Sequence, residues 1–134
     1  MAKNWSTDEL RRALAGVAPA VARRGDEALK TNAEEWVRAA QSAAPVDPVD
    51  GTTLQESIRN HETETGGQIV RAGGPTTRRE GAAGPYDYAR AQEFGRADMP
   101  ANPYFWPTYR LLKKRFVSRR RRAVNKAIKE SYGG

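Results

Sequence analysis

The chain has 134 residues, of which 38% are hydrophobic and 29% charged, so it can form one small domain with a thin core. The lack of cysteine excludes disulfides, thiolate metal sites and a cysteine nucleophile, and the single histidine, His61, excludes a histidine metal cluster within one chain. No apolar run approaches the roughly 20 residues of a membrane span, and the first residues lack a secretory signal, so we expect a protein used in a cytoplasm or in a particle assembled there.

The net charge of +7 is concentrated in one segment. Of the 23 basic residues, ten lie in residues 110–129, which contain no acidic residue. The 13 basic residues elsewhere are outnumbered by 16 acidic ones. An anionic partner is therefore expected for this segment and not for the rest of the chain.

Residues 6–44 carry the pattern of a long helix. Ser6 and Glu9 have the spacing of a capping box, and Pro45 is expected to end the helix. Apolar residues recur at helical spacing: Leu10, Leu14, Val17, Val21, Leu29, Ala33, Trp36, Ala40 and Ala43. Pro19 and Gly25 predict either a kink or two helices in series. The apolar stripe of the first part is narrow, which suggests that this part packs on a neighbour.

The middle of the chain predicts short elements. Residues 45–53 form a turn-rich loop, with Asp47, Asp50 and Gly51 in a turn, and Thr53 and Glu56 predict a second capping box that opens a short helix through Ile58. A hairpin is expected around Gly66-Gly67. Residues 73–85 are rich in glycine and predict a flexible surface loop, or a loop that becomes ordered in an assembly.

The last third of the chain predicts an aromatic turn and a basic helix. Tyr88, Ala89 and Phe94 are expected to pack in the core, and residues 99–107 form a rigid segment with three prolines. The final helix is expected over residues 103–131, with an apolar stripe of Tyr109, Leu112, Phe116, Val117, Val124 and Ile128. The predicted fold is α+β in a single domain: a helical extension over 1–28, an α+β core over 29–109 with a small antiparallel sheet, and a basic helix over 110–134.

No catalytic pattern is evident. Residues 74–84 are glycine-rich but lack the Gly-Lys-Ser/Thr of a phosphate loop. Glu62 and Glu64 share a face of the predicted strand beside His61, yet carboxylates on a polar hairpin are usually solvated. We therefore expect no enzyme activity, no cofactor and no bound metal.

Three segments resemble the motifs of one family. They are Ala44–Ile58, which begins Ala-Pro-Val-Asp and ends Leu-Gln-Glu-Ser-Ile, then Tyr88–Gly95, and then Pro103–Pro107. In this order they are similar to the gene-product-ten-like family of the lambdoid phage HK97, over roughly residues 30–130. The stretches 47–53 and 73–85 are longer here than is usual in the family. Each motif also has a plain physical interpretation as a turn, a core aromatic or a helix start, so the motifs are interpreted as fold determinants.

The resemblance implies a structural protein of the phage neck, assembled in the bacterial cytoplasm and located in the virion between head and tail. It implies a tail-terminator or tail-completion subunit that closes into a ring, a hexamer or a higher ring matching the portal, with no membrane partner. Its expected partners are its own copies, the tail-tube protein and the head connector. A head-side stopper ring and a stand-alone basic nucleic-acid-binding protein are the alternatives.

Two sets of contact residues are predicted. Tyr88, Phe94, Tyr104 and Trp106 are candidates for contacts between subunits, together with the loop 73–85. The basic helix has three interpretations: a solvated face, contact with the phosphates of genomic DNA in the neck lumen, or docking to an acidic surface of an adjoining ring or the tail tube. Its candidate contact residues are Arg115, Arg119, Arg120, Arg122 and Lys126.

Overall fold

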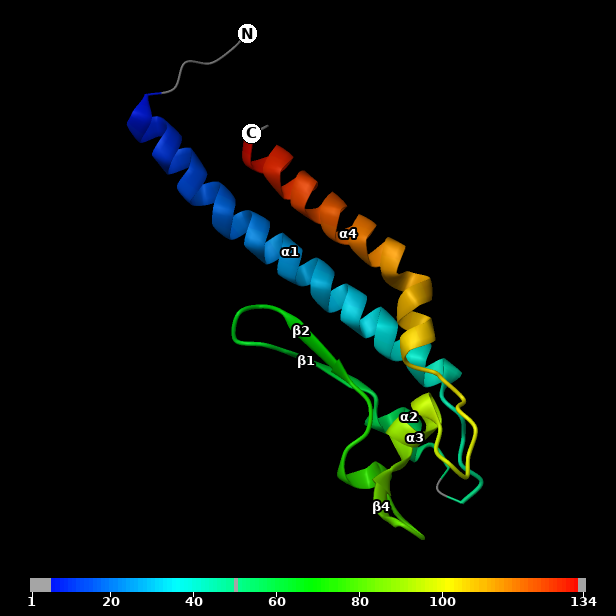
Figure 1. The fold of residues 1–134 in the computed structure, drawn as a ribbon. Helices are drawn as coiled ribbons and strands as arrows, with labels where there is room; N and C mark the ends of the chain where they lie inside the picture. Colours follow the sequence, from blue (N-terminus) through cyan, green and yellow to red (C-terminus); the bar gives the residue numbers. More distant parts are fainter. Residues whose placement is uncertain (1–5, 50, 133–134) are drawn as a thin grey trace.

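Two long antiparallel helices dominate the computed structural model, which describes residues 6–49 and 51–132 (Figure 1). Helix α1 spans Thr7–Ala43, and helix α4 spans Trp106–Tyr132. The short helices α2 (Thr53–Ser57) and α3 (Tyr88–Phe94) gather at the end of this pair where α1 ends and α4 begins. The predicted α+β class, with long first and last helices and small antiparallel sheets between them, is confirmed.

Helix α1 is one continuous helix. The predicted capping box is present: the Ser6 hydroxyl accepts from the Glu9 amide at 3.2 Å, and the Glu9 carboxylate accepts from the Ser6 amide at 2.9 Å. The alternative of two helices in series is wrong, because the helix continues through Pro19 and Gly25. Alanines at five of the positions from 13 to 22 favour helix strongly enough to offset the donor that Pro19 lacks, and Gly25 is buried against α4.

The predicted hairpin around Gly66 is present and packs on α1. Strands β1 (Arg59–Glu62) and β2 (Gln68–Arg71) pair antiparallel, with His61 opposite Ile69. The loop has five residues and is closed by the Thr63 amide, which donates to the Gly67 carbonyl at 2.8 Å. Gly66 has φ +89, and a Cβ there would lie 2.5 Å from the Asp26 carboxylate of α1. The hairpin tip therefore lies close against the long helix.

Residues 73–85 do not form the predicted loop. They contain a 3-10 turn, η1 (Pro75–Thr77), and most of a second hairpin made by β3 (Arg78–Gly81) and β4 (Gly84–Asp87). Thr77 is fully buried, and its hydroxyl donates to Asp87 at 2.8 Å. The prediction was wrong because this hairpin is held by backbone pairing and polar bonds, which leave no apolar pattern in the sequence.

The connection to α2 differs in detail from the prediction. The N-cap residue is Thr52 instead of Thr53, and its hydroxyl donates to the Glu56 carboxylate at 2.9 Å. Asp47 pairs with Gly51 across the predicted turn, and Asp50 lies outside the described residues.

The core lies where the last turns of α1 meet α2, α3 and the start of α4. Its buried members are Val37, Ala40, Ala44, Leu54, Ile58, Tyr88, Ala89, Tyr104 and Phe105. Trp36 stacks on this core, with ring centroids 4.5 Å from Phe105 and 4.8 Å from Tyr109. None of the described helices combines the length and apolar character needed to cross a bilayer.

Helix α4 begins three residues later than predicted and buries most of the predicted stripe. Phe116 is buried, and Tyr109, Leu112 and Val124 are half-buried. The other two predicted members, Val117 and Ile128, are 49% and 37% exposed, and Ala127, which was not predicted, is buried. Arg119 lies on the side of α4 that faces α1 and is bound there to polar groups of α1. Part of the apolar stripe, including Val117, therefore lies at the surface beside this contact.

Candidate assembly interface

A buried carboxylate joins α3 to the start of α4. Glu93 is 6% exposed, and its carboxylate accepts from the backbone amides of Tyr104, Phe105 and Trp106 at 3.2, 3.0 and 3.3 Å. These amides lie at the N-terminus of α4, where donors lack helical partners and the helix dipole favours negative charge. Glu93 therefore caps α4 from a distant position in the sequence.

The turn at Gly95, after α3, fixes the geometry of the junction between α3 and α4. Gly95 ends α3 with φ +79, as its tolerance of positive φ predicted, and a Cβ there would lie 2.9 Å from the Ala101 amide nitrogen. The Asn102 amide donates to the Gln92 carbonyl at 2.7 Å. The segments Tyr88–Gly95 and Pro103–Pro107 thus lock into one structural unit.

The four aromatic candidates separate into two buried and two exposed residues. Tyr104 is 1% exposed and donates from its hydroxyl to the Ala89 carbonyl at 3.0 Å, and Tyr88 is 9% exposed. Burial is the main cause that raises the pKa of Tyr104 above its ordinary value, and the nearby charge of Glu93 raises it further. Burial also raises the pKa of Tyr88, with a smaller contribution from the charge of Asp47. Both rings are packed mainly against their own chain, so they contribute little exposed surface.

Phe94 and Trp106 are the two candidates at the surface. Phe94 is 64% exposed, so the prediction that it packs in the core is wrong. It is the last residue of α3, where the turn at Gly95 directs it out of the core. Trp106 is 42% exposed, and Phe105, beside it, is buried.

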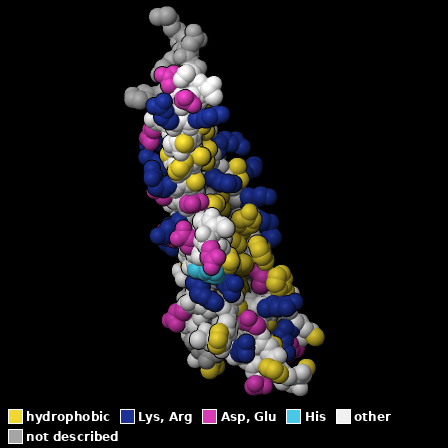
Figure 2. All heavy atoms as spheres, turned by 90° about the vertical axis from the view of Figure 1, so that its left-hand side faces the viewer, with side chains coloured by type: hydrophobic (Ala, Val, Ile, Leu, Met, Phe, Trp, Pro, Cys, Tyr) yellow, Lys and Arg dark blue, Asp and Glu magenta, His cyan; other side chains and the backbone are white. Residues whose placement is uncertain are grey.

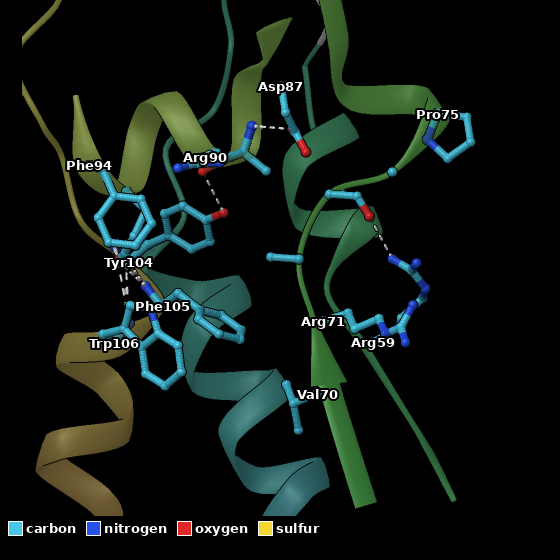
Figure 3. Close-up of a pocket in the computed structure, with 15 residues that line it drawn as sticks. Arg59, Val70, Arg71, Pro75, Asp87, Arg90, Phe94, Tyr104, Phe105 and Trp106 are labelled. Atoms are coloured by element: carbon cyan, nitrogen blue, oxygen red, sulfur yellow. Dashed lines mark hydrogen bonds between the residues drawn. The ribbon is translucent and has the colours of Figure 1, made fainter. Parts of the chain in front are cut away.

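These two rings border an open cavity of about 550 Å³. Figure 3 shows Phe94, Tyr104 and Trp106 on one side and Val70, Arg71 and Pro75 on the other, with Asp87 and Arg90 at one end. Arg59 donates to the carbonyls of Ser57 and Gly73 at 2.6 and 2.8 Å, which holds the hairpin wall in place. The lining mixes rings, arginines and carboxylates, which suits the side chains of a protein partner.

Two of the basic candidates are bound to α1. Arg115 and Arg119 each donate to one oxygen of Glu35 at 2.7 Å, and Arg119 also donates to Asn32 at 2.6 Å. Burial opposes the charged form of Glu35, but the two guanidinium groups outweigh it and hold the pKa of this carboxyl below its ordinary value. Arg119 therefore belongs to the α1–α4 contact.

The other basic candidates lie at the surface. Arg120, Arg122 and Lys126 are exposed. Figure 2 shows lysines and arginines along both edges of the helical part of the molecule, with a hydrophobic band between them. A shallow, largely apolar groove of about 360 Å³ lies between α1, β2 and α4, and Trp36, Val70 and Val117 help to line it.

His61 and the glutamates near it form no site. His61, Glu62 and Glu64 are exposed, and Glu64 lies in the loop beyond β1. Within residues 6–49 and 51–132 there is no group of three histidine or acidic side chains placed to hold a metal ion.

A family model described as "Bacteriophage HK97-gp10, putative tail-component" matches residues 8–95. The chain belongs to this family of phage tail components. The match extends from the first turn of α1 to Gly95, so the predicted family is confirmed. It includes the segments Ala44–Ile58 and Tyr88–Gly95, and the third segment, Pro103–Pro107, lies beyond it. No curated protein and no solved structure matches the chain.

The sequence of this tail component left two central side chains unassigned. In the sequence, Glu93 is one residue of the motif Tyr88–Gly95, and the motif alone does not indicate its role as a cap. A signal for its role exists, because no Ser, Thr, Asp or Asn precedes α4 at Tyr104 or Phe105 to cap it locally. Glu35 was also missed, since nothing in the sequence indicates which acidic residue of α1 lies opposite the arginines of α4.

Proposed function

We propose that this tail component is a subunit of the phage neck, a tail-terminator or tail-completion protein. In this proposal its copies close into a ring, a hexamer or a higher ring matching the portal. The ring caps the tail tube and joins it to the head connector. Membership of a tail-component family supports a location in the phage tail, and the exposed apolar side chains support assembly with other chains.

The observation that carries the proposal is the amount of large apolar surface that the chain leaves uncovered. Among the described residues the exposed large hydrophobic side chains are Leu10, Leu14, Val46, Val49, Phe94, Trp106, Leu111, Val117 and Ile128. They lie at both ends of the molecule and along α4, so one partner on one face would not cover them all. Such a distribution fits a subunit with neighbours on several sides.

The proposed mechanism is geometric. A contact between two different surfaces of the same chain repeats from copy to copy, and it closes into a ring when the rotation between copies fits. The Glu35–arginine pairs join α1 to α4, and Glu93 joins α3 to the start of α4, so these elements can transmit the rotation together. The proposal includes no reaction, cofactor or enzyme activity.

The exposed arginines and lysine of α4 favour a secondary role in contact with DNA. Arg120, Arg122 and Lys126 remain available, whereas Arg115 and Arg119 are bound to Glu35. In a ring with α4 toward the lumen, these side chains would meet phosphates of the genome without reading its sequence.

Electron microscopy of the purified chain mixed with its tail-tube protein tests the main proposal. Rings, or caps on tube ends, are expected. Rings that bind the portal side and leave tube ends bare would indicate the stopper alternative. A monomer that binds DNA at physiological salt and never associates with tubes would reject the neck in favour of a stand-alone DNA-binding protein.

Salt dependence of DNA binding tests the secondary role. Replacing Arg120, Arg122 and Lys126 by glutamine should lower the slope of log affinity against log salt by about one for each phosphate that is no longer neutralised. The same replacements at Arg23, Lys30 and Arg38, which are exposed on α1 outside its first three turns, serve as the control. Equal slopes in the two triple variants would reject a specific role for α4.

A further inference from the structure

The side of α1 that faces α4 continues beyond the end of α4. Arg24 of α1 pairs with Glu130 at 3.0 Å, and the described part of α4 ends at Tyr132. Because the two helices are antiparallel, residues 7–20 of α1 extend past α4, as Figure 1 shows. This segment, called the α1 tip below, is about 20 Å long at 1.5 Å per residue.

The α1 tip carries most of an apolar stripe whose first two members, Leu10 and Leu14, are exposed and whose next two, Val17 and Val21, are half-buried. Leu10, Leu14, Val17 and Val21 recur at i, i+4, i+7 and i+11, in line with the positions that contact α4 further along. Leu10 is 45% and Leu14 is 48% exposed. The stripe that α4 covers in the middle of α1 is therefore bare at its beginning.

The same chain carries an apolar groove of matching length. The 360 Å³ groove is lined by Leu29, Trp36, Val70, Tyr109, Phe116 and Val117. At Val117 and Arg120 it meets a second hollow of about 370 Å³, which continues along α4 to Val124. From Tyr109 to Val124 this surface extends about 22 Å, which is close to the length of the α1 tip.

The tip and the groove of one chain cannot meet each other. Both belong to α1, which is a single helix, and Leu14 lies about 28 Å along it from Ala33, which also lines the groove. The occupant of each must therefore come from another molecule. Every copy of the chain offers both surfaces, and Asp8 in the acidic first turn of the tip is opposite in charge to Arg121, which lines the second hollow.

We infer that the α1 tip of one copy docks in the groove between α1, β2 and α4 of the next copy. This inference rests on the ring proposed above and names its contact. The two surfaces differ, so the contact is head-to-tail, and each copy gives one tip and receives another. Repetition of this contact around an axis would build the ring.

Cysteine cross-linking tests the contact directly, because the chain has no cysteine of its own. A Leu14→Cys chain is mixed with a Val117→Cys chain of different length and then oxidised. The 14–117 product is expected to exceed, by roughly tenfold, the product of Leu14→Cys with Arg78→Cys, an exposed position on β3. Equal yields would overturn the inference, and so would a dominant 14–14 product, which would mean that tips pair with each other.

Light scattering on charge variants gives a second, independent readout. Leu14→Glu is expected to weaken self-association by about a hundredfold, because a charge would enter the apolar groove. Ala15→Glu adds the same charge on another, exposed face of the tip and should leave association unchanged. Circular dichroism of both variants checks that the helices remain folded.

The outcomes separate this inference from the ring itself. Rings that persist in Leu14→Glu would reject the tip-in-groove contact and leave the neck ring standing. A wild-type chain that stays monomeric at every concentration, and on tail-tube ends as well, would reject both. Rings that are lost in Leu14→Glu and kept in Ala15→Glu would support both.

Discussion

The two ends of the helix pair differ in how far their polar backbone groups and apolar side chains are covered by the chain itself. At the α3–α4 end, the first amides of α4 are bonded to Glu93, and Tyr104 and Phe105 are buried. At the opposite end, α1 extends alone, with Leu10 and Leu14 about half exposed. One end is completed within the chain, and in the proposed ring the other end is completed by a neighbouring copy.

The difference between the two ends separates residues that stabilise the fold of the chain from residues that, in the proposed ring, act in assembly. Replacements at the closed end should lower the free energy of unfolding of the isolated chain. Replacements at the open end should leave it nearly unchanged and act on association. Unfolding measurements on four variants test this division.

Phe105→Ala should have the largest effect. Its ring is buried and packs on Trp36 at 4.5 Å, so truncation should cost about 3–5 kcal/mol of unfolding free energy in urea titrations. Leu111→Ala, at a position 83% exposed on α4, is the control and should change stability by less than about 0.5 kcal/mol. Similar costs at the two positions would contradict the assigned core.

Glu93→Ala should rank second. Three backbone amides at the start of α4 would lose a buried, charged acceptor, at a cost of about 3 kcal/mol. Glu80→Ala removes a carboxylate from the exposed face of β3 and should be nearly neutral. An unfolding midpoint that does not move in Glu93→Ala would mean that α4 needs no cap from α3.

Glu35→Gln should have a smaller effect that depends on pH. At pH 7 the loss of its pairs with Arg115 and Arg119 should cost about 1–2 kcal/mol. Because its folded pKa lies below the ordinary 4.5, the stabilisation is complete above about pH 5 and disappears as the pH falls through the lowered pKa. Urea midpoints of the variant and the wild type should therefore converge as the pH is lowered below 4.5, and a constant difference would exclude ionisation of Glu35 as its source.

Leu14→Glu should have the smallest effect on the isolated subunit. At high dilution its free energy of unfolding should stay within about 0.5 kcal/mol of the wild type, because about half of the Leu14 side chain is already exposed to solvent. A decrease comparable to that of Phe105→Ala would show that the tip belongs to the subunit's own core, and the division between the two ends would fail.

The sequence predicted those parts of the fold that are determined locally. The α1 cap at Ser6, the end of α1 before Pro45 and the hairpin at Gly66 each depend on residues within a few positions of one another. The second hairpin was missed because Thr77 and Asp87, which hold it, are polar residues ten positions apart in a glycine-rich stretch. Local patterns contain no record of such pairs.

The candidate contact residues were predicted less well, for the same reason. An aromatic side chain looks alike in sequence whether it is buried, as Tyr104 is, or exposed, as Phe94 is. Likewise, the arginines of α4 are equivalent by composition, and only the position of Glu35 on the facing helix separates Arg119 from Arg120. Which face of a helix is covered is decided by tertiary packing.

Pro19 lies inside the α1 tip and gives it a further property. Proline has no amide hydrogen, so the Ala15 carbonyl lacks its usual partner one turn later, and Gly16 beside it has low helix propensity and open space around it. Helical hydrogen bonding and helix propensity are therefore lowered in the section of α1 that also carries the exposed Leu10 and Leu14. In a free subunit the amides of residues 8–15 should therefore exchange with deuterium sooner than those of the α1 section beneath α4, and ring closure should slow them, so that ordering of this section would report completion of the ring.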